Sequence, residues 1–424
     1  MMYFVRDNGR AAWWLFARKA LLLALVFTLT CQFMTLSFPL RVHADYTDPD
    51  KGKISLEGYL FPNEASSLPS VPTGISAQGA VLINADTGEI LYRQNENARL
   101  PMASTTKIMT ALVAVEALPS DTLVTITKES VGIEGSSIYL TEGEVLTLEE
   151  LLYALMLSSA NDAAVAIAMA VSGSVEAFSE RMNQKAVALG LKNTHFVNPH
   201  GLDDPEHYTT AYELAVIAKE AMSHDLLKTI ISTERKTIPH NGEEGVRLLL
   251  NHNKLLRTYD GAVGVKTGFT KKSGRCLVSA AEKDDLALIA VTLNAPDDWR
   301  DHTKLLDYGF SLYDNTELCV AGAFEAPLWV IGGTHEYVMV RNREGLRLSL
   351  PKDRGSIRLV VEMPRFVYAP LSEGQIIGHL AFYEILPDGG MLLLGKIPLY
   401  AQHEVNAVIY KKSLLEKISE FFGF

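Results

Sequence analysis

Ser104 and Lys107 are spaced so that a helix would bring a hydroxyl and an amine together. Residues three apart share one face of a helix, and the helix N-terminus directs its free N–H groups and positive dipole toward the serine. A serine hydroxyl is a weak nucleophile until a base removes its proton, and a lysine can be that base when burial or a nearby cation lowers its pKa. Alone the spacing is weak evidence, because Ser-x-x-Lys occurs by chance in most long chains.

Two later motifs could complete such a site. Ser159-Ala160-Asn161 follows an apolar helix, and its hydroxyl and amide could relay a proton and orient both Lys107 and a substrate. Lys266-Thr267-Gly268 is expected on a strand, where Lys266 would supply a second cation and Gly268 would let a substrate backbone approach closely. Taken singly, the first is more often a helix cap and the second a plain turn or strand end. All three in this order favour a catalytic interpretation.

Hydrophobic patterning predicts the elements that must position these motifs. Two apolar, β-branched runs, 79–84 and 90–93, are joined by Asp86-Thr87-Gly88 and predict a hairpin. Helices are expected over 104–116 and 177–189 and after two capping boxes, Thr147-x-x-Glu150 and Thr210-x-x-Glu213. Strands return at 274–281 and 287–293. Strands on both sides of a helical insert predict an α+β domain over residues 75–313, with helices packed on one sheet.

Beyond this domain the pattern changes to short strands separated by turns, with no convincing helix between them. The expected strands are 328–331, 337–340, 346–350, 357–363, 375–382 and 391–398. We therefore expect a small all-β domain over residues 314–410. Residues 45–74 are polar, contain four prolines and are expected to form a linker arm.

The N-terminal 44 residues have the features of a secretory signal peptide. Four basic residues precede an apolar run over 20–40, and Val42-x-Ala44 predicts cleavage after Ala44. An uncleaved membrane anchor is the alternative, since 19 apolar-rich residues come close to spanning a bilayer. Lipidation at Cys31 is disfavoured, because Thr28-Leu29-Thr30 is a poor lipidation signal. The sequence thus predicts export to the extracytoplasmic face of a membrane. That this membrane is bacterial, with the protein in the periplasm or cell-wall space, is implied only by the family resemblance given below.

The last residues, 411–424, form an amphipathic pattern. Apolar side chains fall on one helical face and charged ones on the other; the apolar set is Leu414, Leu415, Ile418, Phe421 and Phe422. The segment is too short to span a bilayer. A helix lying in the membrane surface is favoured over a helix docked on the protein.

Charge and cysteine content exclude some classes of protein. The 424 residues carry a net charge of −11, and without residues 1–44 the remaining 34 basic and 49 acidic residues carry −15. Such acidity argues against a nucleic-acid partner. Cys276 and Cys319 remain in the exported part, too few for a disulfide scaffold, and Cys276 is expected to be a buried free thiol.

With these motifs the chain resembles the low-molecular-mass penicillin-binding proteins, the serine-type D-Ala-D-Ala carboxypeptidases. The resemblance is strong over about residues 75–313 and looser beyond. It is carried by five segments: Leu100–Ser104 and the residues that follow to Ala111, MLSSANDAA at 156–164, NPHGL at 198–202, HYTTA at 207–211 and GVKTGFT at 264–270. It implies a β-lactamase/transpeptidase-like catalytic fold.

The resemblance implies a role for each motif residue. Ser104 would be the acylated nucleophile and Lys107 its general base. Ser159 and Asn161 would relay the proton to the leaving D-Ala and hold the substrate amide. Lys266 would lower the pKa of Lys107, and with Thr267 it would receive the terminal carboxylate.

An oxyanion hole is implied at the backbone N–H groups of Ser104 and Phe269. Some relatives carry His at the position of Phe269, which leaves the backbone role intact and any side-chain role in doubt. Arg300 is a candidate for an additional carboxylate contact, although a solvated arginine near a helix start is the preferred interpretation.

The implied substrate is the peptidoglycan stem pentapeptide, with β-lactams as covalent inhibitors. No cofactor or metal is implied. His195, His200 and His207 lack the paired spacing of a zinc helix, and His200 and His207 are expected to hold loop hydrogen bonds. Two alternatives remain, a β-lactamase and a non-catalytic wall-binding relative. No convincing deacylating Glu-x-x-Leu-Asn supports the first, and the second should have lost a motif residue.

Overall fold

The computed structural model describes residues 40–41, 60–61, 67–240 and 245–409. The predicted signal peptide apart from Leu40–Arg41, most of the linker arm and the amphipathic segment 411–424 lie outside the described residues. The chain divides into two compact units. The catalytic unit comprises residues 65–315 and 348–353, and the β unit takes 316–347 and 354–409 together with the two short N-terminal pieces. The return of 348–353 to the catalytic unit is absent from the sequence-based division.

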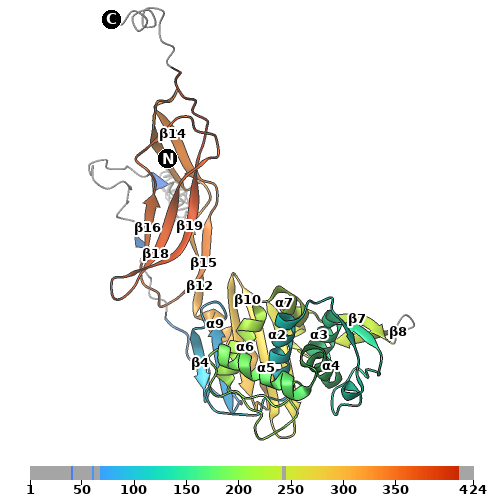
Figure 1. The fold of residues 1–424 in the computed structure, drawn as a ribbon. Helices are drawn as coiled ribbons and strands as arrows, with labels where there is room; N and C mark the ends of the chain where they lie inside the picture. The colour runs from blue at the N-terminus through green and yellow to red at the C-terminus, as the bar shows by residue number, and fades with distance from the viewer. Residues whose placement is uncertain (1–39, 42–59, 62–66, 241–244, 410–424) are drawn as a thin grey trace, which may run out of the picture. The chain divides into compact units, whose positions relative to one another are not determined.

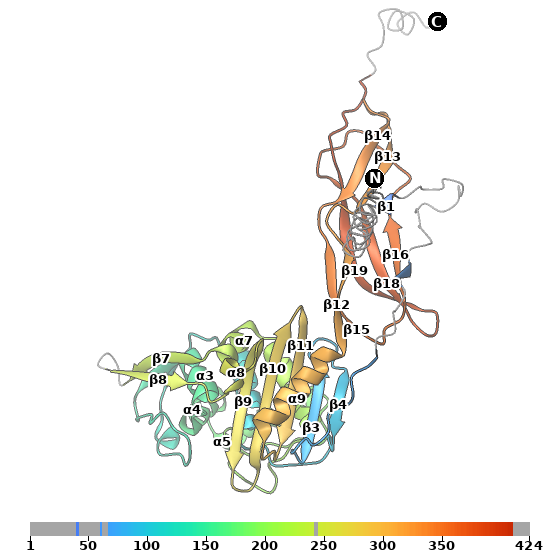
Figure 2. The ribbon, with the colours of Figure 1, turned by 180° about the vertical axis from the view of Figure 1, so that it is seen from behind.

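One antiparallel sheet forms the frame of the catalytic unit. Its strands are β3 (Gly79–Asn84), β4 (Ile90–Gln94), β9 (Ala262–Thr270), β10 (Gly274–Lys283) and β11 (Leu286–Leu293), and their order is β4-β3-β11-β10-β9. The predicted hairpin 79–93 is therefore confirmed as β3 and β4. Helix α9 (Asp298–Ser311) crosses one face of this sheet (Figure 2). Strand β9 is an edge strand, so its outer backbone groups are free to meet a ligand.

The other face of the sheet is covered by a helical cluster (Figure 1). The cluster contains α2 (Lys107–Ala117), α3 (Leu148–Leu157), α4 (Asn161–Ser172), α5 (Val175–Ala188), α6 (Ala211–Met222) and α7 (Asp225–Ser232). The short α8 (Leu255–Thr258), the turns η1 (Ala103–Thr106) and η2 (Lys128–Ser130) and the ribbons β5–β6 (Leu123–Thr125, Val145–Thr147) and β7–β8 (Arg235–His240, Gly245–Leu250) complete the unit. The α+β prediction is confirmed.

Two hydrophobic cores lie on the two sides of the sheet. The larger joins α2, α3, α4 and α6 to the side chains of Val81, Val278 and Val291, and the smaller lies under α9. No single described helix is long and apolar enough to cross a membrane; α4 and α5 pass such a test only as a pair, bent by 83°.

The two predicted capping boxes differ in the structure. Thr147 accepts the Glu150 N–H, and the Glu150 carboxylate accepts the Thr147 N–H, so the first box is complete. Thr210 accepts the Glu213 N–H, but the Glu213 carboxylate binds the backbone N–H groups of Lys192 and Asn193 instead. The second is therefore only half a capping box, because the Glu213 carboxylate accepts hydrogen bonds from a neighbouring loop and not from the Thr210 N–H.

The described residues of the β unit form strands and turns but no helix, which confirms the all-β prediction. Its main sheet contains β13 (Phe324–Ile331), β14 (Tyr337–Asn342), β16 (Ile357–Glu362), β17 (Phe366–Tyr368), β18 (Ile376–Ile385) and β19 (Met391–Ala401). The two-residue strands β1 (Leu40–Arg41) and β2 (Leu60–Phe61) pair with β13 and β16. Strands β12 (Tyr313–Cys319) and β15 (Leu346–Pro351) pair as a separate two-stranded ribbon. Each of these strands has residues assigned to both units.

Candidate active site

Ser104 lies in the short turn η1, immediately before helix α2. Hydroxyls of the next two residues brace the turn: Thr105 Oγ1 donates to Met102 O at 2.6 Å and Thr106 Oγ1 to Ala103 O at 2.8 Å. Ala103 has a φ of 46°, in the left-handed region that non-glycine residues rarely adopt. The turn thus holds Ser104 at the helix entry beside a strained residue, Ala103, and such strain is common at functional sites.

Lys107 is fully buried, and its Nζ has three oxygen neighbours. Nζ lies 3.0 Å from Ser104 Oγ, 2.7 Å from Asn161 Oδ1 and 2.6 Å from the carbonyl oxygen of His200. An ammonium donates to all three. A neutral amine donates its two protons to the amide and carbonyl oxygens, which accept only, and its lone pair is then left for the serine hydroxyl. The geometry therefore suits a general base.

Burial and a neighbouring cation lower the pKa of Lys107 well below its usual value. Burial is the largest cause, repulsion from Lys266 is the next, and the carboxylate of Asp162 acts in the opposite direction. The pKa of Lys266 falls to about 7, again through burial. Two buried ammonium groups close together disfavour double protonation, which favours a neutral Lys107.

Ser159 and Asn161 occupy the break between α3 and α4, as the sequence predicted. Ser159 has a φ of 57° and is buried, and Asn161 is the first residue of α4. Asn161 is held from two directions: its Nδ2 donates to Glu134 O at 2.6 Å and its backbone N–H to Ser136 O at 2.7 Å. The amide oxygen is thereby fixed toward Lys107, which determines the direction of that hydrogen bond.

Asp162 supports this arrangement and was missed by the sequence analysis. Its buried carboxylate accepts hydrogen bonds from Ser137 Oγ at 2.6 Å, from Leu140 N at 3.1 Å and from the N–H of Ile138. These bonds fix the loop whose carbonyls hold Asn161. The only signal available in the sequence was its place directly after Ser159-Ala160-Asn161.

Lys266 and Gly268 lie on β9, the strand that packs against the turn η1. Lys266 is 1% exposed and donates to Thr267 O at 3.1 Å. A Cβ at Gly268 would lie 3.0 Å from Ser104 N and 3.1 Å from Thr105 N, closer than ordinary contacts allow. Only glycine lets the strand approach the turn this closely. Thr267 is half-buried and Phe269 is exposed on the same edge strand.

A loop that contains His200 and His207 packs against the turn η1 and the start of α2. The His207 Nδ1 accepts the Val197 N–H at 3.1 Å, so its Nε2 carries the proton and donates to Thr106 Oγ1 at 2.7 Å. Burial lowers the pKa of His207 to about 4 and that of His200 to about 3, so both are neutral. The loop reaches the turn through Gly201, where a Cβ would lie 1.9 Å from Ala103 O.

All three histidines of this region make loop hydrogen bonds, as expected for His200 and His207. Besides His207, the His200 Nδ1 accepts the Leu202 N–H, and the His195 Nδ1 lies 2.6 Å from Glu206 O. A different grouping that could hold a cation consists of Glu116, Glu220 and His224. Its carboxylates already bind the Lys185 ammonium, at 2.5 and 3.0 Å.

Two arginines, Arg300 on α9 and Arg275 on β10, have different surroundings. Arg300 is 70% exposed, and its nearest acidic partner is Asp297 at 3.8 Å. Arg275 lies directly opposite Phe269 in the β9–β10 register, and its guanidinium binds the buried carboxylate of Asp298 at 2.9 Å. Arg275, which the sequence analysis did not consider, therefore lies nearer to the motif strand in the sheet.

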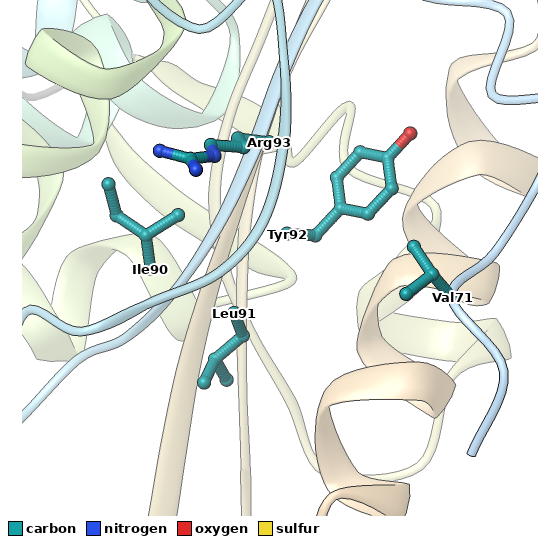
Figure 3. A pocket seen from close by; sticks show the side chains of 5 residues that line it. All are labelled: Val71, Ile90, Leu91, Tyr92 and Arg93. Carbon is teal, nitrogen blue, oxygen red and sulfur yellow. The ribbon is translucent and has the colours of Figure 1, made fainter. Parts of the chain in front are cut away.

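A hollow of about 370 Å³ lies elsewhere on the catalytic unit (Figure 3). It is lined by Val71 and by residues 90–93 of β4, the strand at the opposite edge of the sheet from β9. Its lining contains none of the motif residues. Cys276 lies in the core as a buried free thiol, as predicted.

Comparison with known proteins places this site in a family context. The family model of D-alanyl-D-alanine carboxypeptidases matches residues 65–297. A D-alanyl-D-alanine carboxypeptidase of Bacillus subtilis is 36% identical over 340 residues, covering 78% of this chain and 86% of the relative. An Escherichia coli enzyme of the same name is 31% identical over 361 residues, 79% of this chain and 87% of its own.

Solved structures agree with the sequence relatives. Penicillin-binding protein 5 of Haemophilus influenzae aligns with a TM-score of 0.56 at 29% identity, over 80% of this chain and 100% of that one. The Streptomyces K15 DD-transpeptidase aligns at 0.54 with 34% identity, over 58% of this chain and 100% of its own. The second match is confined to a smaller part of the chain, and the first extends over more of it.

Proposed function

The chain belongs to the D-alanyl-D-alanine carboxypeptidase family and is a serine hydrolase of that kind, and we propose that its reaction runs through an ester on Ser104. The observation that supports this most is the three-way contact of Lys107 with Ser104, Asn161 and the His200 carbonyl. These contacts leave the lone pair of a neutral Lys107 amine facing the Ser104 hydroxyl, from which it can accept a proton.

The proposed substrate is the peptidoglycan stem pentapeptide. Lys107 takes the Ser104 proton as Oγ attacks the carbonyl carbon of the penultimate D-Ala. The C–N bond then breaks, and the departing D-Ala amine receives a proton through Ser159 and Lys107. Water hydrolyses the ester, which regenerates the Ser104 hydroxyl and releases the shortened peptide. Asn161 holds the substrate amide in both steps.

Binding is proposed along the outer edge of β9. Lys266 and Thr267 receive the terminal carboxylate, and the N–H groups of Ser104 and Phe269 stabilise the oxyanion. Gly268 supports this assignment, because its lack of a side chain brings the strand within van der Waals distance of Ser104 N. Arg275 is proposed as a second contact for the carboxylate, in place of Arg300.

We further propose that the enzyme works on the extracytoplasmic side of the membrane. Its substrate class lies in the cell wall, and residues 1–44 have the composition of a signal peptide. Residues 411–424 are proposed to hold the exported chain on the membrane surface. β-Lactams, which resemble the substrate at the scissile bond, are proposed to acylate Ser104 persistently.

Fluorescent penicillin tests this assignment. We expect one label per chain, attached at Ser104 in a peptide digest, and D-Ala release from an acyl-D-Ala-D-Ala peptide. Ser104→Ala should abolish both, and Ser120→Ala, at an ordinary serine outside the motifs, should abolish neither. Labelling that survives Ser104→Ala contradicts the nucleophile. Rapid penicillin turnover without D-Ala release would support the β-lactamase alternative, which the comparisons do not favour.

A further inference from the structure

Five large apolar side chains are exposed together on the outer face of the β unit. They are Trp329, Ile331, Tyr337, Phe366 and Tyr368, each between 44% and 67% exposed. Their neighbours on the opposite face of the same strands, among them Leu328, Val330 and Val338, are buried. These five residues, called here the aromatic tip, are thus the solvent side of strands whose other side already forms the core.

The strand register makes the aromatic tip continuous. Tyr337 on β14 and Phe366 on β17 flank Trp329 on β13, so these three rings form one row across three strands. Ile331 pairs with Tyr368 in the next row, and the Phe366 and Tyr368 rings pack edge to face with centroids 5.6 Å apart. Directly paired side chains on one sheet face touch, so this is one surface rather than five isolated residues.

The same face is polar at its other end. Two rows back from Trp329 along β13, Glu325 pairs with Arg341, and Pro327 pairs with Met339 between them. Charged, intermediate and aromatic rows therefore follow one another along the strand direction. A glycan-binding platform needs no such gradient, whereas a surface that enters a membrane interface at one end does, since Trp and Tyr favour the headgroup level and charges favour water.

The chain leaves the described structure at the aromatic end. Ala407 pairs with Gly333, and the Val408 N–H donates to Gly332 O at 2.8 Å, next to Ile331 in sequence. Val408 and Ile409 are themselves 57% and 81% exposed. The 15 residues that follow, 410–424, include the amphipathic pattern described above. The last described residues before the proposed anchor thus lie beside Gly332 and Gly333, which follow Ile331 of the aromatic tip.

We propose that the aromatic tip is a second membrane contact, which enters the bilayer interface beside the terminal segment. The occupant is the lipid headgroup–acyl boundary. Contact at two points fixes the orientation of the β unit on the membrane, whereas a terminal segment alone would act as a flexible tether. The proposal rests in part on the proposed anchoring by residues 411–424, and its test separates the two.

Trp329 itself reports on the contact. In the exported chain, residues 45–424, the tryptophans are Trp299 and Trp329, so a Trp299→Phe variant leaves Trp329 as the only one. With vesicles of phosphatidylethanolamine and phosphatidylglycerol, we expect a blue shift of its emission and quenching by dibrominated acyl chains. Tyr368→Ser and Phe366→Ser should weaken vesicle binding. Leu392→Ser, at an exposed apolar residue of β19, should leave it unchanged.

Four outcomes overturn the proposal. Vesicle binding without any change in Trp329 emission leaves the terminal anchor intact and removes the aromatic tip from the membrane. No vesicle binding by the full chain rejects both contacts. A response of Trp329 to peptidoglycan fragments but not to vesicles identifies a glycan site. A change of Trp329 emission on Ile418→Asp without vesicles shows that the terminal segment covers the aromatic tip.

Discussion

Lys107 and Lys266 lie buried in one site, in different surroundings. Lys107 has three fixed oxygen neighbours, and its pKa is lowered by burial and by Lys266. Lys266 donates to a single backbone carbonyl and keeps a pKa of about 7. The proposed roles agree with these surroundings, since a base needs a free lone pair and a partner for a carboxylate needs a charge.

The pH dependence of acylation should therefore respond to Lys266. Lys266→Gln removes the like charge, so the pKa of Lys107 rises. The acid limb of the second-order rate constant for penicillin acylation should then move to higher pH. Stopped-flow labelling across pH 5–10 measures this. Lys271→Gln, at an exposed lysine beyond β9, should leave the limb in place, and an unmoved limb in the Lys266 variant would contradict the coupling.

The two arginines provide a matched test of carboxylate binding. Arg275→Gln should raise KM for an acyl-D-Ala-D-Ala peptide about tenfold, as expected for the loss of one charge-assisted hydrogen bond. Arg300→Gln should change KM little, because that side chain is 70% exposed. Steady-state kinetics with the peptide and with its terminal amide compare the two variants. Equal sensitivity of KM to both would remove Arg275 from the binding site.

At the scale of elements, strand β9 and the turn η1 that precedes α2 meet with almost no space between them. Gly268 on the strand and Gly201 on the loop both approach the turn η1 more closely than a Cβ would allow. On the opposite face of the sheet, α9 contributes a different kind of contact. His302 is fully buried between hydroxyls of β10 and β11, with Nε2 2.9 Å from Thr292 Oγ1 and Nδ1 against Ser279 Oγ.

His302 predicts a loss of stability in acid. Burial lowers its pKa to about 3, whereas the unfolded chain takes up the proton near pH 6.5. Stability from this group is therefore complete above pH 6.5 and falls as pH decreases toward 3, by up to about 1.4 kcal/mol per pH unit. His302→Gln should flatten the fall in the free energy of unfolding between pH 6.5 and 4.

Denaturant titrations at several pH values measure that slope, independently of any uniform destabilisation by the variant. His335→Gln, at an exposed histidine of the β unit, is the control and should retain the original slope. Since His200 and His207 also have lowered pKa values, part of the acid sensitivity should persist in the His302 variant. A slope that His302→Gln leaves unchanged would assign the sensitivity to other groups.

At the scale of the whole molecule, the proposed arrangement is an exported enzyme held on a membrane by its end. Deleting residues 412–424 should move the protein from the membrane fraction to the soluble fraction while penicillin labelling persists. All the site residues named above belong to the catalytic unit, so we expect catalysis to persist without the terminal segment. Fractionation with label detection measures both. Unchanged membrane association would contradict the need for this segment and leave the aromatic tip or an uncleaved N-terminal span as the membrane contact.

The sequence alone determined the motifs, the antiparallel α+β core and the all-β end, because these follow from local spacing, hydrophobic periodicity and a family resemblance that covers the motif segments. It also placed Ser159-Ala160-Asn161 at the end of an apolar helix and Lys266 on a strand, but it did not predict helix α4. Local patterns could not show what lies across space. The His200 carbonyl against Lys107, the Asp162 brace and the position of Arg275 join segments distant in sequence.

The sequence analysis did not predict the exposed aromatic row, for the same reason. Trp329 and Tyr337 occur in two predicted strands, whereas Phe366 lies outside every predicted strand. Only the pairing of β13 with β14 and β17 aligns their outward side chains. Strand register is set by packing of the buried face and by turn geometry, which no single strand encodes. The tertiary structure therefore decided which polar atoms meet in the site and which apolar side chains share a surface.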